Sequence, residues 1–243
     1  MQLTDEEIRQ IIIREKKRKR RRARIIKRVA VLVIFVLILV IGIGVFINRN
    51  AVASPRGIIF IDPGHGGIDA GSCAGKRYEK NDTLKISKLV KKDLEDLGFK
   101  VYMSRTEDVD VDRAERGVMA NDKKARLFVS IHRNKATEGE GVEIYISSEN
   151  DRESNLLAAN IIKALASNGF TNRGITSGTL VSSSEDYYEN SIPEMPSCLI
   201  ELGFIQNSAD NKLFDEKLEL NADAIAKAIE KTYKELYEPK EIE

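Results

Sequence analysis

Both histidines of this 243-residue chain follow apolar runs that are typical of buried strands. His65 lies in Ile58–Gly67 (IIFIDPGHGG), where a glycine-rich turn ends the run. His132 directly follows the run Leu127–Ile131 (LFVSI). In open α/β sheets, ligands collect at the carboxyl ends of the strands, and both imidazoles are expected there. Two neutral imidazoles and one carboxylate suit a catalytic zinc ion, which keeps a fourth position for water.

Two glutamates are candidates for the carboxylates of such a site. Glu201 ends a third apolar run, Cys198–Ile200 (CLI). Glu79 opens a segment whose apolar positions recur at the spacing of one helix face, which places it in the first turn. A carboxylate there also suits the positive end of the helix dipole. An ordinary first-turn acid has the same pattern, so spacing alone leaves both interpretations of Glu79 open.

Four motifs occur in an order that resembles one enzyme family. They are IDPGHGGIDAGS, the pair Glu79-Lys80 before a long helix, SIHRN and IELGFIQN. Together they resemble the zinc-dependent N-acetylmuramoyl-L-alanine amidases of the amidase-3 family, over roughly residues 56–237. The resemblance implies that His65, Glu79 and His132 bind Zn²⁺. It also implies that Glu201 is the catalytic carboxylate.

Further residues around these motifs are expected to support or extend the site. Arg116 stands at a position that is common in the family, and we expect it to support the structure of the site. Asp62 either orients the ligands through a hydrogen bond or caps the turn. Arg133 and Asn134, next to His132, are expected to contact the substrate. The Arg133 side chain is expected either to contact an anionic part of the peptide stem or to point into solvent.

The elements that must position these residues alternate between strands and helices. This order predicts an α/β fold, a three-layer α/β/α sandwich with a mixed, mostly parallel sheet of about five or six strands. The expected strands are 57–62, 100–104, 127–132, 142–146 and 197–201, and the expected helices are 79–97, 112–124, 153–167 and 216–237. Apolar and polar residues alternate in Val142–Ile146, which favours a half-exposed edge strand. An antiparallel direction is one option for this strand. Asn172–Pro196 resembles an insertion and is expected to form a lid, a wall of the substrate site or a mobile surface loop.

The first fifty residues differ in charge from the rest of the chain. They carry 13 Lys or Arg against 4 Asp or Glu, whereas the remainder carries 26 against 34. A basic block, Arg14–Arg28, precedes the uncharged stretch Val29–Ile47, which is long enough to span a bilayer as a helix. Basic residues before the span place the N-terminus in the cytoplasm. We therefore expect a cytoplasmic segment (1–28), a transmembrane anchor (29–47), a linker (48–56) and an extracytoplasmic catalytic domain (57–238).

The leading hypothesis is a single-pass membrane enzyme that acts on peptidoglycan. It would hydrolyse the amide between the lactyl group of N-acetylmuramic acid and L-alanine. The alternatives are a zinc peptidase that acts on another cell-wall amide and a non-catalytic homologue that binds muropeptides. A nucleic-acid partner is disfavoured, because the membrane span accounts for the basic block. The resemblance also allows for a protein activator and for a role in sporulation.

Overall fold

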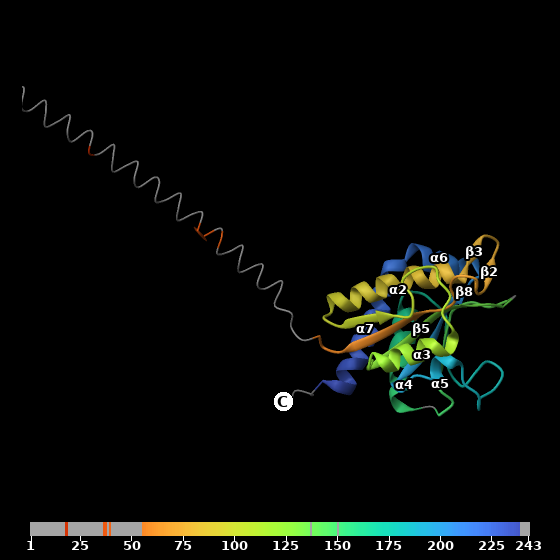
Figure 1. The fold of residues 1–243 in the computed structure, drawn as a ribbon. Coiled ribbons are helices and arrows are strands. Elements are labelled where there is room, and N and C mark those ends of the chain that lie inside the picture. Colours follow the sequence, from red (N-terminus) through yellow and green to blue (C-terminus); the bar gives the residue numbers. More distant parts are fainter. Residues whose placement is uncertain are drawn as a thin grey trace, which may run out of the picture. The chain divides into compact units, whose positions relative to one another are not determined.

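The computed structural model describes residues 18, 36, 37, 39, 55–136, 138–149 and 151–238 (Figure 1). The chain divides into two units after Ser54. Nearly all of the predicted cytoplasmic segment 1–28 and of the predicted anchor Val29–Ile47 lies outside the described residues. Within the described part of the chain, no helix is long and apolar enough to cross a membrane. The anchor and its topology therefore stay predictions.

A mixed sheet of six strands forms the centre of the unit that begins at Pro55, with the strand order β4-β1-β5-β8-β6-β7. The strands are β1 (Ile58–Pro63), β4 (Lys100–Met103), β5 (Leu127–Asn134), β6 (Val142–Ile146), β7 (Asn172–Ser177) and β8 (Ser197–Phe204). β4, β1, β5 and β8 are parallel, β6 is antiparallel to β8, and β7 is parallel to β6. A separate hairpin pairs β2 (Cys73–Ala74) with β3 (Arg77–Tyr78). The predicted α/β class and mixed, mostly parallel sheet are confirmed.

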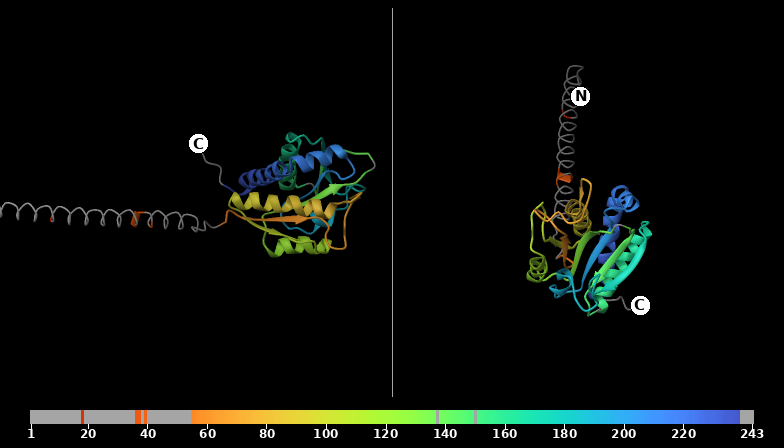
Figure 2. Two further views of the ribbon diagram at one scale, coloured as in Figure 1. Left: turned by 90° about the horizontal axis from the view of Figure 1, so that it is seen from above. Right: turned by 90° about the vertical axis from the view of Figure 1, so that its right-hand side faces the viewer.

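Helices cover both faces of the sheet, as the left-hand view of Figure 2 shows for α2 and α3 on either side of β1. The helices are α2 (Glu79–Asp96), α3 (Arg113–Asp122), α4 (Arg152–Ser167), α5 (Tyr188–Ser191), α6 (Ser208–Glu216) and α7 (Leu218–Tyr237). Apolar residues of α2, α4 and α7 form the larger core with one face of the sheet. On the other face, Phe60 and Phe128 pack with Ala120 of α3.

Alternation along β5 determines which face each side chain reaches. Val129 and Ile131 lie in the larger core, whereas Phe128 lies in the core beneath α3. The same period places His132 on the α3 side of the sheet and Arg133 on the opposite side. Neighbours in the sequence thus receive different surroundings.

Two predicted elements differ from the structure. β6 was expected at the edge of the sheet, but it lies between β8 and β7, and four of its five residues are buried. Its antiparallel direction against β8 agrees with the option raised from the sequence. β7 occupies the edge instead, in a polar segment (NRGITS) that lacks the alternation typical of strands. The segment 172–196 thus contributes a strand and the short helix α5, which the sequence did not predict.

Candidate metal centre and catalytic cavity

The turn after β1 holds His65 in an uncommon backbone conformation. His65 has a φ of 60°, in the left-handed region that side chains other than glycine rarely adopt. Two buried arginines fix this turn by donating to its carbonyl oxygens. Arg105 Nε lies 3.0 Å from Pro63 O. Arg116 Nη1 lies 2.8 Å from the same oxygen, and Arg116 Nη2 lies 3.2 Å from His65 O. These contacts stabilise a conformation that the chain would not hold by itself.

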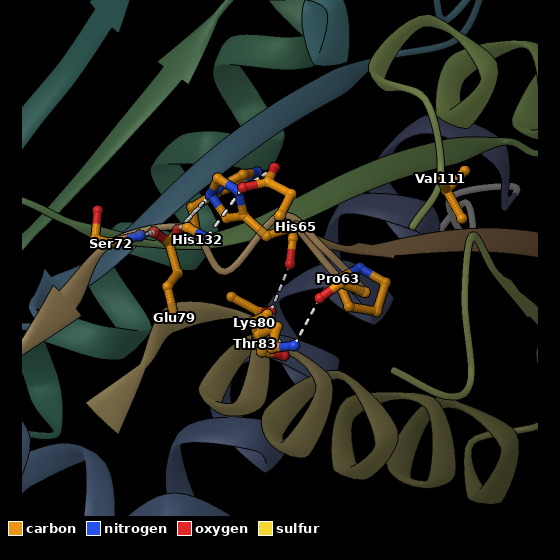
Figure 3. A network of polar contacts seen from close by, with 12 residues as sticks. Pro63, His65, Ser72, Glu79, Lys80, Thr83, Val111 and His132 are labelled. Atoms are coloured by element: carbon orange, nitrogen blue, oxygen red, sulfur yellow. Dashed lines mark hydrogen bonds and ion pairs between the residues drawn. The ribbon is translucent and has the colours of Figure 1, made fainter. Parts of the chain in front are cut away.

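His65, Glu79 and His132 bring three ligand atoms together at the carboxyl end of the parallel strands. Glu79 Oε1 lies 3.1 Å from His65 Nε2 and 3.0 Å from His132 Nδ1 (Figure 3). One atom from each residue lies within 4.8 Å of the other two. Tetrahedral ligands bound at about 2.0–2.1 Å from a zinc ion lie about 3.3 Å from one another. The donor set and its spacing therefore fit a zinc ion.

Backbone amides and one further carboxylate orient these ligands. Glu79 is almost fully buried, and it accepts hydrogen bonds from the amides of Ser72 (2.7 Å, to Oε2) and Arg133 (2.9 Å, to Oε1). The Asp69 carboxylate lies 2.7 Å from His65 Nδ1, which directs Nε2 of that ring toward Glu79. Asp69 was missed in the sequence, although it stands four residues after His65 in the same motif.

The charges of this cluster reinforce one another. Burial of Glu79 raises the pKa of its carboxyl. The hydrogen bonds and charges of His132 and His65 outweigh this effect of burial, so the pKa of Glu79 is lowered overall. Burial likewise opposes a charge on His132, yet the hydrogen bond and charge of Glu79 raise the pKa of the imidazole to about 9. The ionised carboxylate is therefore ready to accept a cation.

Gly64 provides the space that His132 occupies. A Cβ atom at this position would lie 2.3–2.6 Å from three atoms of the His132 ring. Gly64→Ala is therefore expected to displace the ring and to weaken metal binding by about 10–100-fold, as the loss of ligand positioning typically does. Competition with a chelator would measure this affinity. Lys88→Ala, at an exposed position on α2, is the control. Wild-type affinity in Gly64→Ala would contradict the ring position.

Glu201 faces the same cavity from β8. Its strand pairs with β5 so that Glu201 is the register partner of His132. The cavity has a volume of about 250 Å³, and both residues line it. Within the described part of the chain, Glu201 Oε2 is buried without a hydrogen-bond partner. Burial raises the pKa of Glu201 to about 8, nearby carboxylates add to the rise, and His132 opposes it. A carboxyl whose pKa lies near the operating pH can both accept a proton and return it.

Asp62 and Arg116 form a buried pair beneath the turn. Arg116 Nη1 lies 2.7 Å from Asp62 Oδ1, and the hydroxyls of Ser104 and Ser130 also donate to the carboxylate. Burial opposes the charge on Asp62, but Arg116 and the two hydroxyls outweigh it and lower the pKa of this carboxyl. The sequence suggested a supporting role for each residue but did not indicate that they pair.

The two residues expected to contact the substrate lie in different surroundings. The Arg133 side chain has no exposed surface, its Nη1 lies 2.6 Å from Asp82, and its guanidinium stacks on Phe214. Its other nitrogens donate to Asn211 and to backbone carbonyls, and Arg133 also lines the cavity. A substrate contact at Arg133 stays a prediction. Asn134 lines the cavity. A substrate contact at Asn134 stays a prediction.

The segment 172–196 supplies part of the cavity wall. Tyr187 and Glu189 both line the cavity. Asn121 of α3 holds the following residues, because its side chain donates to Ile192 O and accepts from the Glu194 amide, each at 3.0 Å. No sequence signal identified Glu189, which lies in a stretch without helical or strand periodicity.

Comparisons with known proteins show a family match and close structural relatives. A sequence model of the family described as N-acetylmuramoyl-L-alanine amidase matches residues 59–231. The uncharacterized protein YqiI of Bacillus subtilis is 37% identical over 180 residues, which cover 72% of this chain and 84% of YqiI. The chain spans 52% of the length of a longer staphylococcal relative, to which it is 32% identical over 166 residues.

Two solved structures extend this similarity to the fold. N-acetylmuramoyl-L-alanine amidase AmiC2 of Nostoc punctiforme superposes with a TM-score of 0.66 at 31% identity, covering 74% of this chain and 98% of AmiC2. The CwlD amidase of Clostridioides difficile, solved in complex with the GerS lipoprotein, gives a TM-score of 0.63 at 25% identity. That superposition covers 72% of this chain and 98% of CwlD.

Proposed function

This chain belongs to the amidase-3 family of N-acetylmuramoyl-L-alanine amidases, and we propose from that premise that it is a zinc-dependent peptidoglycan amidase. The bond hydrolysed joins the lactyl group of N-acetylmuramic acid to the L-alanine of the stem peptide. One observation supports this function above others. His65, Glu79 and His132 gather three ligand atoms within 4.8 Å at the cavity that Glu201 lines.

The residues of the chain divide the work of amide hydrolysis among them. A zinc ion, when bound, supplies Lewis acidity that polarises the scissile carbonyl and acidifies the attacking water. Glu201 accepts a proton from that water and passes it to the departing nitrogen, which must be protonated to leave. Asp69 keeps His65 Nε2 free for the metal by accepting the proton of Nδ1. Asn134 lines the cavity, which supports the proposal that it contacts the substrate.

Digestion of purified peptidoglycan by the full-length chain tests this function. We expect peptides with a free N-terminal L-alanine to appear while the number of glycan reducing ends stays constant. Removal of metal by a chelator should stop the release, and added Zn²⁺ should restore it. Release of other amino termini would indicate the peptidase alternative. Saturable binding without release would indicate a binding homologue.

An N-terminal membrane anchor is proposed from the sequence alone. The apolar stretch Val29–Ile47 follows the basic block directly, an arrangement that favours a cytoplasmic N-terminus and an extracytoplasmic catalytic domain. Peptidoglycan lies on that side of the membrane, so the topology agrees with the proposed substrate.

Protease added to intact spheroplasts should therefore remove the domain after Asn50 and leave the first 28 residues protected. Immunoblotting with antibodies against each part would measure both outcomes. Complete protection of the domain, with digestion only after lysis, would contradict the proposed topology.

A protein partner is also proposed, by analogy with one relative. The CwlD amidase was solved in complex with the GerS lipoprotein. This chain shares the fold of CwlD, and an activator that docks beside its cavity is consistent with that likeness. A role in sporulation is a further proposal, which rests on the resemblance of a tethered catalytic domain to sporulation amidases.

A further inference from the structure

Glu189 of α5 is a buried carboxylate to which neither the family motifs nor the proposed mechanism assigns a role. It is 6% exposed and lines the catalytic cavity together with His132 and Glu201. One of its carboxylate oxygens lies within 4.8 Å of a ring nitrogen of His132. Burial of a carboxylate is costly unless a polar contact or a ligand compensates, so the surroundings of Glu189 matter.

His132 offers an unsatisfied polar group. Its Nδ1 lies 3.0 Å from Glu79 Oε1, on the side where the metal ligands converge. Within the described part of the chain, its Nε2 is buried and has no hydrogen-bond partner. A ring nitrogen of His132 and carboxylate oxygens of Asp62 and Glu189 all lie within 4.8 Å of one another. Since Nδ1 is directed to Glu79, Nε2 is the nitrogen left to face these two carboxylates.

Glu189 is the better acceptor of the two. Asp62 already accepts from Arg116, Ser104 and Ser130, which occupy both of its oxygens. Glu189 lines the cavity together with His132. Nε2 has no partner at hydrogen-bond distance, and a contact across a longer gap is commonly bridged by one water. A second metal ion among Asp62, His132 and Glu189 is disfavoured, because the guanidinium of Arg116 lies 2.7 Å from Asp62.

We propose that Glu189 is a positioning residue that accepts the Nε2 proton of His132 through one bridging water and so presents Nδ1 to the metal. The outer nitrogen of a metal-binding histidine usually donates to a carboxylate, a carbonyl or a water, which fixes the tautomer and orientation of the ring. Asp69 does this for His65, and Glu189 does it for His132. The proposal rests on the proposed function, because it assumes a metal held by His65, Glu79 and His132.

This role makes the segment 172–196 part of the metal centre. Glu189 reaches the cavity from α5, and Asn121 anchors the residues that follow α5 to α3. A partner or substrate that moved α5 would therefore change how firmly His132 is held.

The test uses the full-length chain with Glu189→Met, Glu189→Gln and the exposed control Glu185→Gln. Methionine keeps the size of the side chain but accepts no proton, and glutamine keeps an accepting oxygen without the charge. We expect Glu189→Met to weaken Zn²⁺ binding by about 10–100-fold, the usual cost of losing such a contact. Glu189→Gln should recover part of that loss, and Glu185→Gln should bind Zn²⁺ like wild type.

A spectroscopic readout separates positioning from simple packing. The chain has two histidines, so selective ¹⁵N labelling yields two imidazoles in the zinc-loaded protein. In wild type, His132 should be protonated at Nε2, with a proton that exchanges slowly with solvent. In Glu189→Met, that resonance should shift and its exchange should accelerate. The Nδ1 proton of His65, held by Asp69, should stay unchanged as an internal control.

Three results would overturn the proposal. The first is an unchanged Nε2 resonance and unchanged Zn²⁺ affinity in Glu189→Met, which would leave Glu189 as a wall residue only. The second is a loss of Zn²⁺ affinity in Glu185→Gln as large as the loss in Glu189→Met. The third is two metal ions per wild-type chain and one in Glu189→Met, which would indicate a second metal site. These measurements do not depend on which bond is cut, so failure to release N-terminal L-alanine would contradict the proposed function alone.

Discussion

Glu201→Gln is expected to lower the turnover of peptidoglycan by about 10²–10⁴-fold, the typical cost of losing a general base. Glutamine keeps the size and shape of the side chain but cannot accept the proton of the attacking water. Glu201 is not part of the group His65, Glu79 and His132, whose ligand atoms lie within 4.8 Å of one another, so metal content and folding should be retained. The rate of amine release, measured beside the metal content, would separate these effects.

Glu219→Gln, at an exposed position on α7, is the matched control and should retain full activity. Near-normal turnover in Glu201→Gln would dismiss Glu201 as the base. Loss of metal in the same variant would instead assign this residue to the coordination shell. Either result would require a different division of roles between Glu201 and Glu79.

Loss of Glu79 is expected to weaken metal binding more than the change at Gly64, because a ligand is removed rather than displaced. Wild type should purify with about one zinc ion per chain, as three-ligand catalytic sites do. Glu79→Ala should lower the affinity by more than about 100-fold, which exceeds the usual cost of losing a supporting contact. His65→Ala and His132→Ala should abolish tight binding. Elemental analysis and chelator competition would measure both quantities.

Folding must be followed in the same experiment. Glu79→Ala also leaves the buried amide of Arg133 without an acceptor, at a cost of about 1–3 kcal/mol, and removes the acceptor of the half-buried Ser72 amide. Glu79→Gln keeps one accepting oxygen and should fold closer to wild type while still binding metal weakly. The exposed residue Glu95 provides the control, Glu95→Ala. Unchanged zinc content in folded Glu79→Gln and Glu79→Ala would show that the third ligand is another residue.

Part of the site could be predicted because strand ends in a parallel sheet meet at one edge. His65, His132 and Glu201 each follow an apolar run, and the structure brings all three to one cavity. Glu79 needed the family resemblance, since an acid in the first turn of a helix is common for reasons unrelated to metals. The structure then distinguishes it by its burial and by its contacts with both imidazoles.

The rest depends on tertiary packing that local patterns do not encode. Arg133 was grouped with His132 by sequence proximity, but alternation along β5 sends the two side chains to opposite faces of the sheet. Asp69 and Glu189 lie in segments without periodicity, and their partners become visible only when the turn and α5 are folded. β7 was missed for a related reason, since its polar residues form an edge strand by pairing with β6.

Hydrolysis of muramyl-peptide in H₂¹⁸O tests the central claim most directly, because the oxygen of the attacking water enters the acyl side of the bond that is cut. The account predicts one ¹⁸O atom in the lactyl carboxylate of the muramic acid product and none in the peptide, which leaves with a free L-alanine amino terminus. Mass spectrometry of both products would locate the label. Label in a peptide carboxylate, with the lactyl amide intact, would contradict amidase activity at the proposed bond.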